Sequence, residues 1–288
     1  MTQHKWLVVV LGAIALSGLA SCTSSNSSTS QVVARGQEEV KITGSGTAYA
    51  PLKVIANAYA SQASNVKVTF LPHSQSSSGV VGAKEGLVNI GSVTRKPKPE
   101  EDDGSLGYQL LAVDALLVAT HPSVGKISNL STEELKAIYS GSVTNWQQLG
   151  GVDAEIIVLD RPEDESAKRL LRQYYLGDEL KMSPNAVVLR HESDLIAAVQ
   201  NTPHSIGAFS LAQAITNQLP VNHLSLNGVA ATPENVKTGK YTMVRKLGIV
   251  FQNNASAVTQ DLINFAVSET GKGALVESGF VPTSQVVE

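Results

Sequence analysis

Two patterns of apolar residues alternate along most of the chain. Runs with the spacing of a strand occupy residues 40–43, 66–71, 88–92, 154–160, 204–215 and 243–252. Apolar positions with helical spacing occupy residues 50–63, 76–86, 131–139, 165–177, 191–202 and 257–278. Residues 108–121 predict a long strand pair or a segment that crosses between two parts of the fold. This order predicts an α/β fold in which helices cover both faces of parallel sheets.

The first residues form an export signal rather than part of the fold. A short basic start is followed by an apolar run of signal-peptide length, and Leu19-Ala20-Ser21 then precede Cys22. Small residues before a cysteine resemble the lipobox of bacterial lipoproteins, which implies a signal peptide over 1–21 and lipidation of Cys22. An ordinary secretory signal that contains a cysteine is the alternative. Residues 22–38 are rich in Ser and Thr, and we expect a flexible stalk there.

Composition limits the classes of function that remain. Cys22 is the single cysteine, which excludes a disulfide framework, a cysteine-ligated metal and a cysteine nucleophile in the body of the protein. A net charge of −3 argues against a nucleic-acid partner. With so little overall charge, we expect an anionic ligand to be recognised by local geometry rather than by a general field. The 250 residues from 39 to 288 are enough for two lobes.

Three junctions between a strand and a helix have a composition that suits a bound anion. They lie at 44–49, 74–79 and 160–166, where glycines, hydroxyls and one arginine precede a helix. Arg161 in the third junction has the planar fork that pairs with oxyanions. A plain glycine-rich turn, a solvated serine loop and a surface arginine paired with neighbouring acids are the respective alternatives.

The sequence offers no positive sign of catalysis. The six histidines show no metal-ligand spacing, and neither a GxSxG elbow nor a paired set of carboxylates is present. We therefore expect no enzyme activity, no cofactor and no metal site.

Six segments resemble successive blocks of the phosphate-binding proteins of bacterial phosphate ABC transporters. The most specific are IYSGSVTNW (138–146) and SETGKGALVESGFVP (268–282). The resemblance implies a two-lobed type II periplasmic-binding-protein fold with a two-strand hinge. It further implies that a monomer, anchored in the periplasm or at the cell surface, delivers phosphate to the permease subunits. We expect one lobe over 39–118 and 209–288 and the other over 119–208.

The resemblance also implies which residues contact the anion: Thr47, Ala48, Tyr49, Ser76, Ser78, Gly79, Asn89, Arg161, Glu165, Ser166 and Ala167. Asn89 is expected where the family has an aspartate that accepts the phosphate proton, and Glu165-Ser166-Ala167 replace Ser-Gly-Thr. An asparagine weakens the selection against sulfate because its amide donates as well as accepts. Glu165 either restores an acceptor or points to solvent. Sulfate, phosphonate and molybdate remain alternative ligands, with a phosphate sensor and an exported phosphatase as alternative functions.

Overall fold

The computed structural model describes residues 38–283. The expected signal peptide, Cys22 and nearly all of the expected stalk lie outside these residues. Within them, no helix is both long enough and apolar enough to cross a membrane.

The first lobe is built on five strands in the order β2 (Val66–Phe70), β1 (Glu38–Gly44), β3 (Ile90–Val93), β12 (Val244–Gln252) and β4 (Leu106–Thr120). The first three are mutually parallel, whereas β12 is antiparallel to both of its neighbours. One face packs on α1 (Tyr49–Ala60), α8 (Ala257–Val267) and α9 (Glu269–Glu277). On β12, Ile249 belongs to that core while Val250 contacts α2 (Ser76–Lys84), so α2 covers the opposite face.

The second lobe continues the same sheet through β8 (Ser205–Ser210), β6 (Ile157–Asp160) and β7 (Val187–Val188), which are parallel to one another. Its helices are α3 (Thr132–Ser140), α4 (Ser166–Leu171), the π-helical turn η4 (Arg172–Leu176), α5 (Glu192–Asn201), α6 (Leu211–Thr216) and α7 (Pro233–Lys237). Short strands complete the lobe: β5 (Asn129–Leu130), β9 (Asn222–His223), β10 (Ser225–Leu226), β11 (Val229–Ala230) and β13 (Val281–Pro282).

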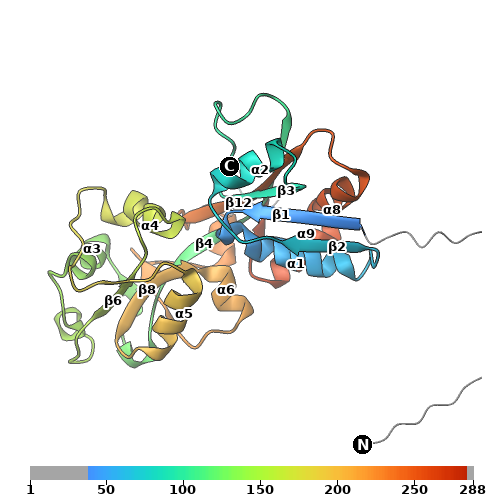
Figure 1. The fold of residues 1–288 in the computed structure, drawn as a ribbon. Helices are drawn as coiled ribbons and strands as arrows, with labels where there is room; N and C mark the ends of the chain where they lie inside the picture. The colour runs from blue at the N-terminus through green and yellow to red at the C-terminus, as the bar shows by residue number, and fades with distance from the viewer. Residues whose placement is uncertain (1–37, 284–288) are drawn as a thin grey trace, which may run out of the picture. The chain divides into compact units, whose positions relative to one another are not determined.

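Two long strands connect the cores of the two lobes (Figure 1). In β4, Leu111 and Ala112 belong to the first core, and the apolar residues from Val113 onward belong to the second. In β12, Leu247 belongs to the first core. Met243, the residue just before this strand, belongs to the second core. This arrangement confirms the two-lobed α/β fold with a two-strand crossing. Because residues up to Met243 before β12 pack in the second core, we propose that the chain returns to the first lobe there, later than the expected 209, and that Val281 packs once more in the second core.

The local predictions are mostly confirmed, with two corrections. The helix expected at 131–139 begins with a capping box of Ser131 and Glu134, and residues 106–120 form one continuous crossing strand. The expected strand at 204–215 is wrong in its second half, since Ser210 caps helix α6 there. The sheet is mixed rather than parallel, because the crossing strands run antiparallel to their neighbours. Packing between distant strands sets this direction, which local periodicity does not encode.

Candidate functional site

A cavity of about 1090 Å³ lies between the two lobes. The first lobe lines it with the start of α1, the loop before α2 and the residues that follow β3. The second lobe contributes the loop after β6, the first turns of α4 and α5, and part of α6, while the start of β12 lies at the crossing. Strand ends and helix starts therefore meet here, as the sequence predicts for a ligand site.

The cavity is locally positive although the chain as a whole is not. Two carboxylates line it, Glu165 and Glu192. Seven cationic side chains also line it: Lys53, Arg95, Arg161, Arg169, Arg190, Arg245 and Lys246. Four of these cations are paired with carboxylates: Arg95 with Glu101, Arg161 with Glu165, Arg190 with Asp164, and Arg245 with Asp114 and Glu192. The expectation that local geometry rather than a general field recognises the anion therefore stays a prediction.

Four helices that begin at the cavity lack a side-chain cap. The residues before α1, α2, α4 and α5 are Ala48, Gln75, Glu165 and His191, and none accepts a hydrogen bond from its helix. Five other helices each have a Ser or Thr cap: Ser131, Ser210, Thr232, Ser256 and Ser268. Amides without a protein acceptor at a helix start are free to donate to an anion. The missing caps thus coincide with the cavity.

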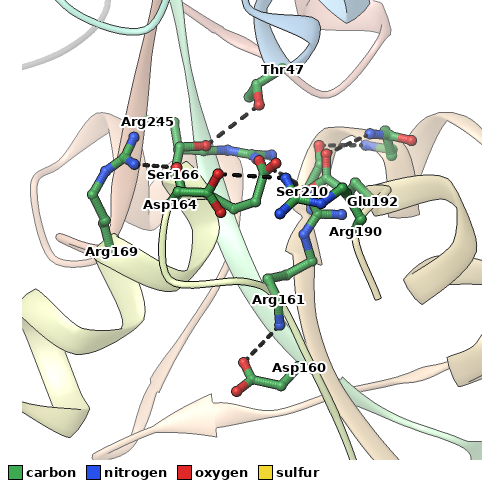
Figure 2. A network of polar contacts seen from close by, with 12 residues as sticks. Thr47, Asp160, Arg161, Asp164, Ser166, Arg169, Arg190, Glu192, Ser210 and Arg245 are labelled. Carbon is green, nitrogen blue, oxygen red and sulfur yellow. Dashed lines mark hydrogen bonds and ion pairs between the residues drawn. The ribbon is translucent and has the colours of Figure 1, made fainter. Parts of the chain in front are cut away.

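Arg161 is held at the floor of this cavity with part of its guanidinium unpaired. It follows β6, and its backbone N–H donates to Asp160 Oδ1 at 2.8 Å (Figure 2). The residue is 8% exposed, and Nη2 lies 3.1 Å from Glu165 Oε2. Nε and Nη1 are buried and have no partner among the described residues. A buried donor without an acceptor is costly, so this fork is suited to an anion.

Glu165 is the less engaged of the two carboxylates that line the cavity. Glu192 accepts from Arg245, from the Ser210 N–H and from the Gln213 amide at 3.1–3.2 Å. Glu165 contacts Arg161, and its side chain does not cap the α4 helix that it precedes. Apart from Arg161, its carboxylate has no donor among the described residues, so it retains free oxygen lone pairs.

Hydroxyl groups from both lobes meet in the cavity. Thr47 Oγ1 and Ser166 Oγ lie 3.4 Å apart (Figure 2). This contact joins the residues just before α1 in the first lobe to the start of α4 in the second. Within the first lobe, Ser76 Oγ lies 3.2 Å from Thr94 Oγ1 and accepts the Thr94 N–H at 3.1 Å. Thr94 directly follows β3, and the sequence prediction missed it. Each hydroxyl can donate to an anion oxygen while accepting from its neighbour.

Six of the residues expected from the sequence line the cavity: Thr47, Tyr49, Ser76, Arg161, Glu165 and Ser166. Tyr49 contributes less than expected because its hydroxyl donates to the Leu71 carbonyl at 2.8 Å. Burial raises the pKa of this phenol, so Tyr49 stays neutral.

The other five expected residues do not line the cavity. Ala48 and Ala167 are buried, with the Ala48 N–H donating to the Ser45 carbonyl at 3.1 Å. The side chain of Ser78 is exposed to solvent. A Cβ at Gly79 would lie 2.8 Å from the Ser92 carbonyl, so this glycine allows α2 to approach the sheet closely.

Asn89, the expected selectivity residue, does not line the cavity. It precedes β3, at the opposite end of that strand from Thr94, and its Oδ1 accepts the Lys41 N–H at 2.8 Å. The amide therefore joins neighbouring backbone segments of the first lobe rather than contacting the cavity.

A buried ion-pair network lies where the two crossing strands meet. Arg245 and Asp114 are opposite each other in β12 and β4, with Nη2 and Oδ2 2.6 Å apart. The Arg245 Nη1 also lies 3.1 Å from Glu192 Oε1 (Figure 2). Burial alone would lower the pKa of Arg245, but the two carboxylates outweigh it and raise the pKa, so Arg245 remains charged. This network fixes the first turn of α5 to the crossing.

Comparison with known proteins agrees with this geometry. A family model described as a PBP superfamily domain matches residues 29–270. The chain is 31% identical over 251 residues to the phosphate-binding protein PstS of Borreliella burgdorferi, covering 84% of this chain and 89% of that protein. It is 24% identical over 295 residues to PstS of Bacillus subtilis, covering 99% and 96% of the two chains.

Solved structures show the same relationship. One comes from Clostridium perfringens, is assigned as a phosphate ABC transporter substrate-binding protein and contains bound phosphate. It superposes with a TM-score of 0.74 at 26% identity, covering 85% of this chain and 100% of that one. PstS from Borrelia burgdorferi superposes with a TM-score of 0.56 at 29% identity, covering 85% and 98%.

Proposed function

Because this chain belongs to the PBP superfamily and, within it, to the PstS-type phosphate-binding proteins, we propose that it captures inorganic phosphate for an ABC transporter. Capture takes place outside the cytoplasm, in the cavity between the two lobes. The bound anion is then delivered to the permease subunits of the transporter.

The observation that carries this proposal is the state of Arg161. Its Nε and Nη1 are buried without a partner among the described residues, in a cavity that brings together seven cations. An anion enclosed there loses its water and needs donors that are already in position. Adjacent guanidinium N–H groups match adjacent oxygens of a tetrahedral oxyanion.

Donors from both lobes complete the proposed site. Ser76 and Thr94 face the cavity from the first lobe, and Ser166 faces it from the second. The amides at the uncapped starts of α1 and α2 add partial positive charge. An anion that accepts hydrogen bonds from both lobes stabilises a closed arrangement of the lobes relative to an open one. Only in the closed arrangement do the donors of both lobes reach the same anion.

We assign to Glu165 the selection between oxyanions. Monohydrogen phosphate carries a proton that a carboxylate accepts, whereas fully ionised sulfate carries none and is repelled by that carboxylate. Glu165 lies 3.1 Å from the Arg161 guanidinium and so would lie beside an anion bound to the same fork. Asn89 does not line the cavity, and its side-chain oxygen already accepts the Lys41 N–H.

Anchoring through lipidated Cys22 remains part of the proposal, with the protein acting as a monomer in the periplasm or at the cell surface. Replacing Cys22 with Ser tests the anchor, since it is expected to leave an unacylated precursor in the membrane. A normally processed but unlipidated mature chain in the unmodified protein would contradict the lipobox interpretation.

Calorimetric titration with phosphate, sulfate, molybdate and a simple phosphonate tests the ligand. We expect one phosphate per chain and weaker binding of the other three anions. Tighter binding of another oxyanion would replace phosphate in the proposal. Release of phosphate from a monoester would favour the exported phosphatase. Tight phosphate binding by a protein whose loss leaves phosphate uptake unchanged would favour a sensor.

A further inference from the structure

Lys168 is a fully buried lysine directly behind the proposed anion site. It occupies the third position of α4, and its side chain is 1% exposed. Its ammonium pairs with the Asp160 carboxylate, which is 6% exposed, and lies 5.7 Å from the centre of the Tyr139 ring. Lysines are almost never buried to this extent, and those that are buried are paired.

The Lys168–Asp160 pair joins the two ends of the loop that carries Arg161. Asp160 is the last residue of β6, and Lys168 lies in the first turn of the helix that follows the loop. The other Asp160 oxygen, Oδ1, accepts the Arg161 N–H (Figure 2). The Asp160 carbonyl accepts the Leu189 N–H at 2.9 Å. Arg161 is thus held directly, and Ser166 lies within the segment that the pair encloses.

Folding stability alone does not account for a cation at this position. A positive charge in the first turn of a helix opposes the helix dipole. Desolvation of a buried ion pair roughly cancels its attraction, so apolar residues of similar size are often as stabilising. What an ion pair adds is a fixed direction between two groups, which matters where a binding side chain has to be held in place.

We infer that Lys168 and Asp160 are positioning residues for the anion site, acting through Arg161. The inference rests on the proposed function and extends it to residues that do not line the cavity. By fixing both ends of the loop before the anion arrives, the pair lowers the ordering cost that Arg161 would otherwise incur on binding.

A variant cycle with phosphate calorimetry tests this inference. Replacing Lys168 with Met and Asp160 with Asn in the full chain removes the link without leaving a buried charge. We expect the Kd for phosphate to rise at least fivefold while the melting temperature without phosphate changes little. In an Arg161→Lys background, where the planar contact is already lost, the same pair of substitutions should change the Kd less than twofold.

Two outcomes would overturn the inference. One is a Kd within twofold of the parent for the Lys168→Met/Asp160→Asn protein. The other is an equal loss in both backgrounds, because the pair would then act independently of Arg161. If this protein does not fold, Lys168→Leu/Asp160→Asn, which likewise leaves no buried charge, goes through the same cycle with the same outcomes.

A matched control and a separate readout distinguish this inference from the proposed function. Tyr139→Phe removes a buried hydroxyl that has no partner among the described residues, next to the same ammonium, and should leave the Kd unchanged. If the parent chain does not bind phosphate at all, the proposed function fails. The cycle is then run with whichever oxyanion the parent binds, and the same two outcomes decide the positioning role.

Discussion

Thr47 and Ser166 are 119 residues apart in the chain, yet their hydroxyl oxygens lie 3.4 Å from each other between the lobes. Each belongs to a strand-to-helix junction, one in the first lobe and one in the second. Each of these hydroxyls can give up its bond to the other and donate to an anion instead, so one anion between them can accept from both. Their contact shows that the two junctions face one site.

Replacing Thr47 with Val should therefore weaken phosphate binding at least fivefold without unfolding the protein. Valine keeps the shape of the side chain but removes the donor, and a hydrogen bond to a charged group contributes about 1.5–3 kcal/mol. Calorimetry measures the change in Kd, and the melting temperature without ligand provides the control. An unchanged Kd would place the anion away from this contact.

Replacing Arg161 with Ala should weaken anion binding far more. Removing one partner of a buried charged contact costs about 2–5 kcal/mol, or roughly 30-fold to several-thousandfold in affinity. Arg161→Lys should recover only part of this loss, since an ammonium cannot make the two-bond planar contact. Titration of both variants with phosphate checks the order. Phosphate affinity equal to that of the parent in Arg161→Ala would show that the site is misplaced.

Local sequence patterns were sufficient to locate the junctions that form the site. Arg161 could be nominated because it follows a strand and precedes a helix, and such positions converge at one edge of the sheet, whereas Ser76 was nominated from the family resemblance within a junction of the same kind. Thr94 also lies at the carboxyl end of a strand, since it directly follows β3, although no helix comes next. It was missed because the family's selectivity residue was expected at Asn89, at the other end of the strand.

Other features depend on long-range pairing and leave no local signal. The sequence around Arg245 shows only the pattern of a strand. Arg245 belongs to the buried ion-pair network because β12 pairs with β4 in a register that places Arg245 opposite Asp114. Lys168 belongs to a helix with an ordinary amphipathic pattern, and its burial follows from the position of Asp160 below it. The mixed direction of the sheet has the same origin.

Glu165→Gln should reduce the discrimination between phosphate and sulfate. The amide lacks the negative charge that repels sulfate, so sulfate affinity should rise while phosphate affinity falls or stays level. Asn89→Asp is the matched control and should leave both affinities within twofold of the parent, because residue 89 bonds to the Lys41 backbone. Competition titration checks both variants. If Asn89→Asp shifts selectivity and Glu165→Gln does not, the two assignments must be exchanged.

The loop that carries Arg95 should lose stability only in strong acid. Arg95 donates to both Glu101 oxygens at 2.6 and 2.7 Å, and Lys98 N–H donates to Oε2 at 2.8 Å. The hydrogen bonds from Arg95 lower the pKa of Glu101 from 4.5 to about 2. Since the folded pKa is the lower one, the stabilisation is complete above the unfolded pKa and disappears as the pH falls from about 4.5 to about 2.

The size of this effect should be modest, because 34% of the Arg95 side chain is exposed and solvent screens the pair. We expect Glu101→Gln to lower the free energy of unfolding by about 1 kcal/mol at neutral pH. Urea unfolding of the parent and of this variant between pH 7 and pH 2 measures the difference, which should be constant down to about pH 4.5 and then shrink toward zero. Glu100→Gln, which alters an exposed neighbour, should show no such trend. A difference between parent and Glu101→Gln that persists unchanged at pH 2 would contradict this account. Protonating Glu101 would then remove none of the stability that the substitution removes, so residue 101 would stabilise the fold through packing rather than through its charge.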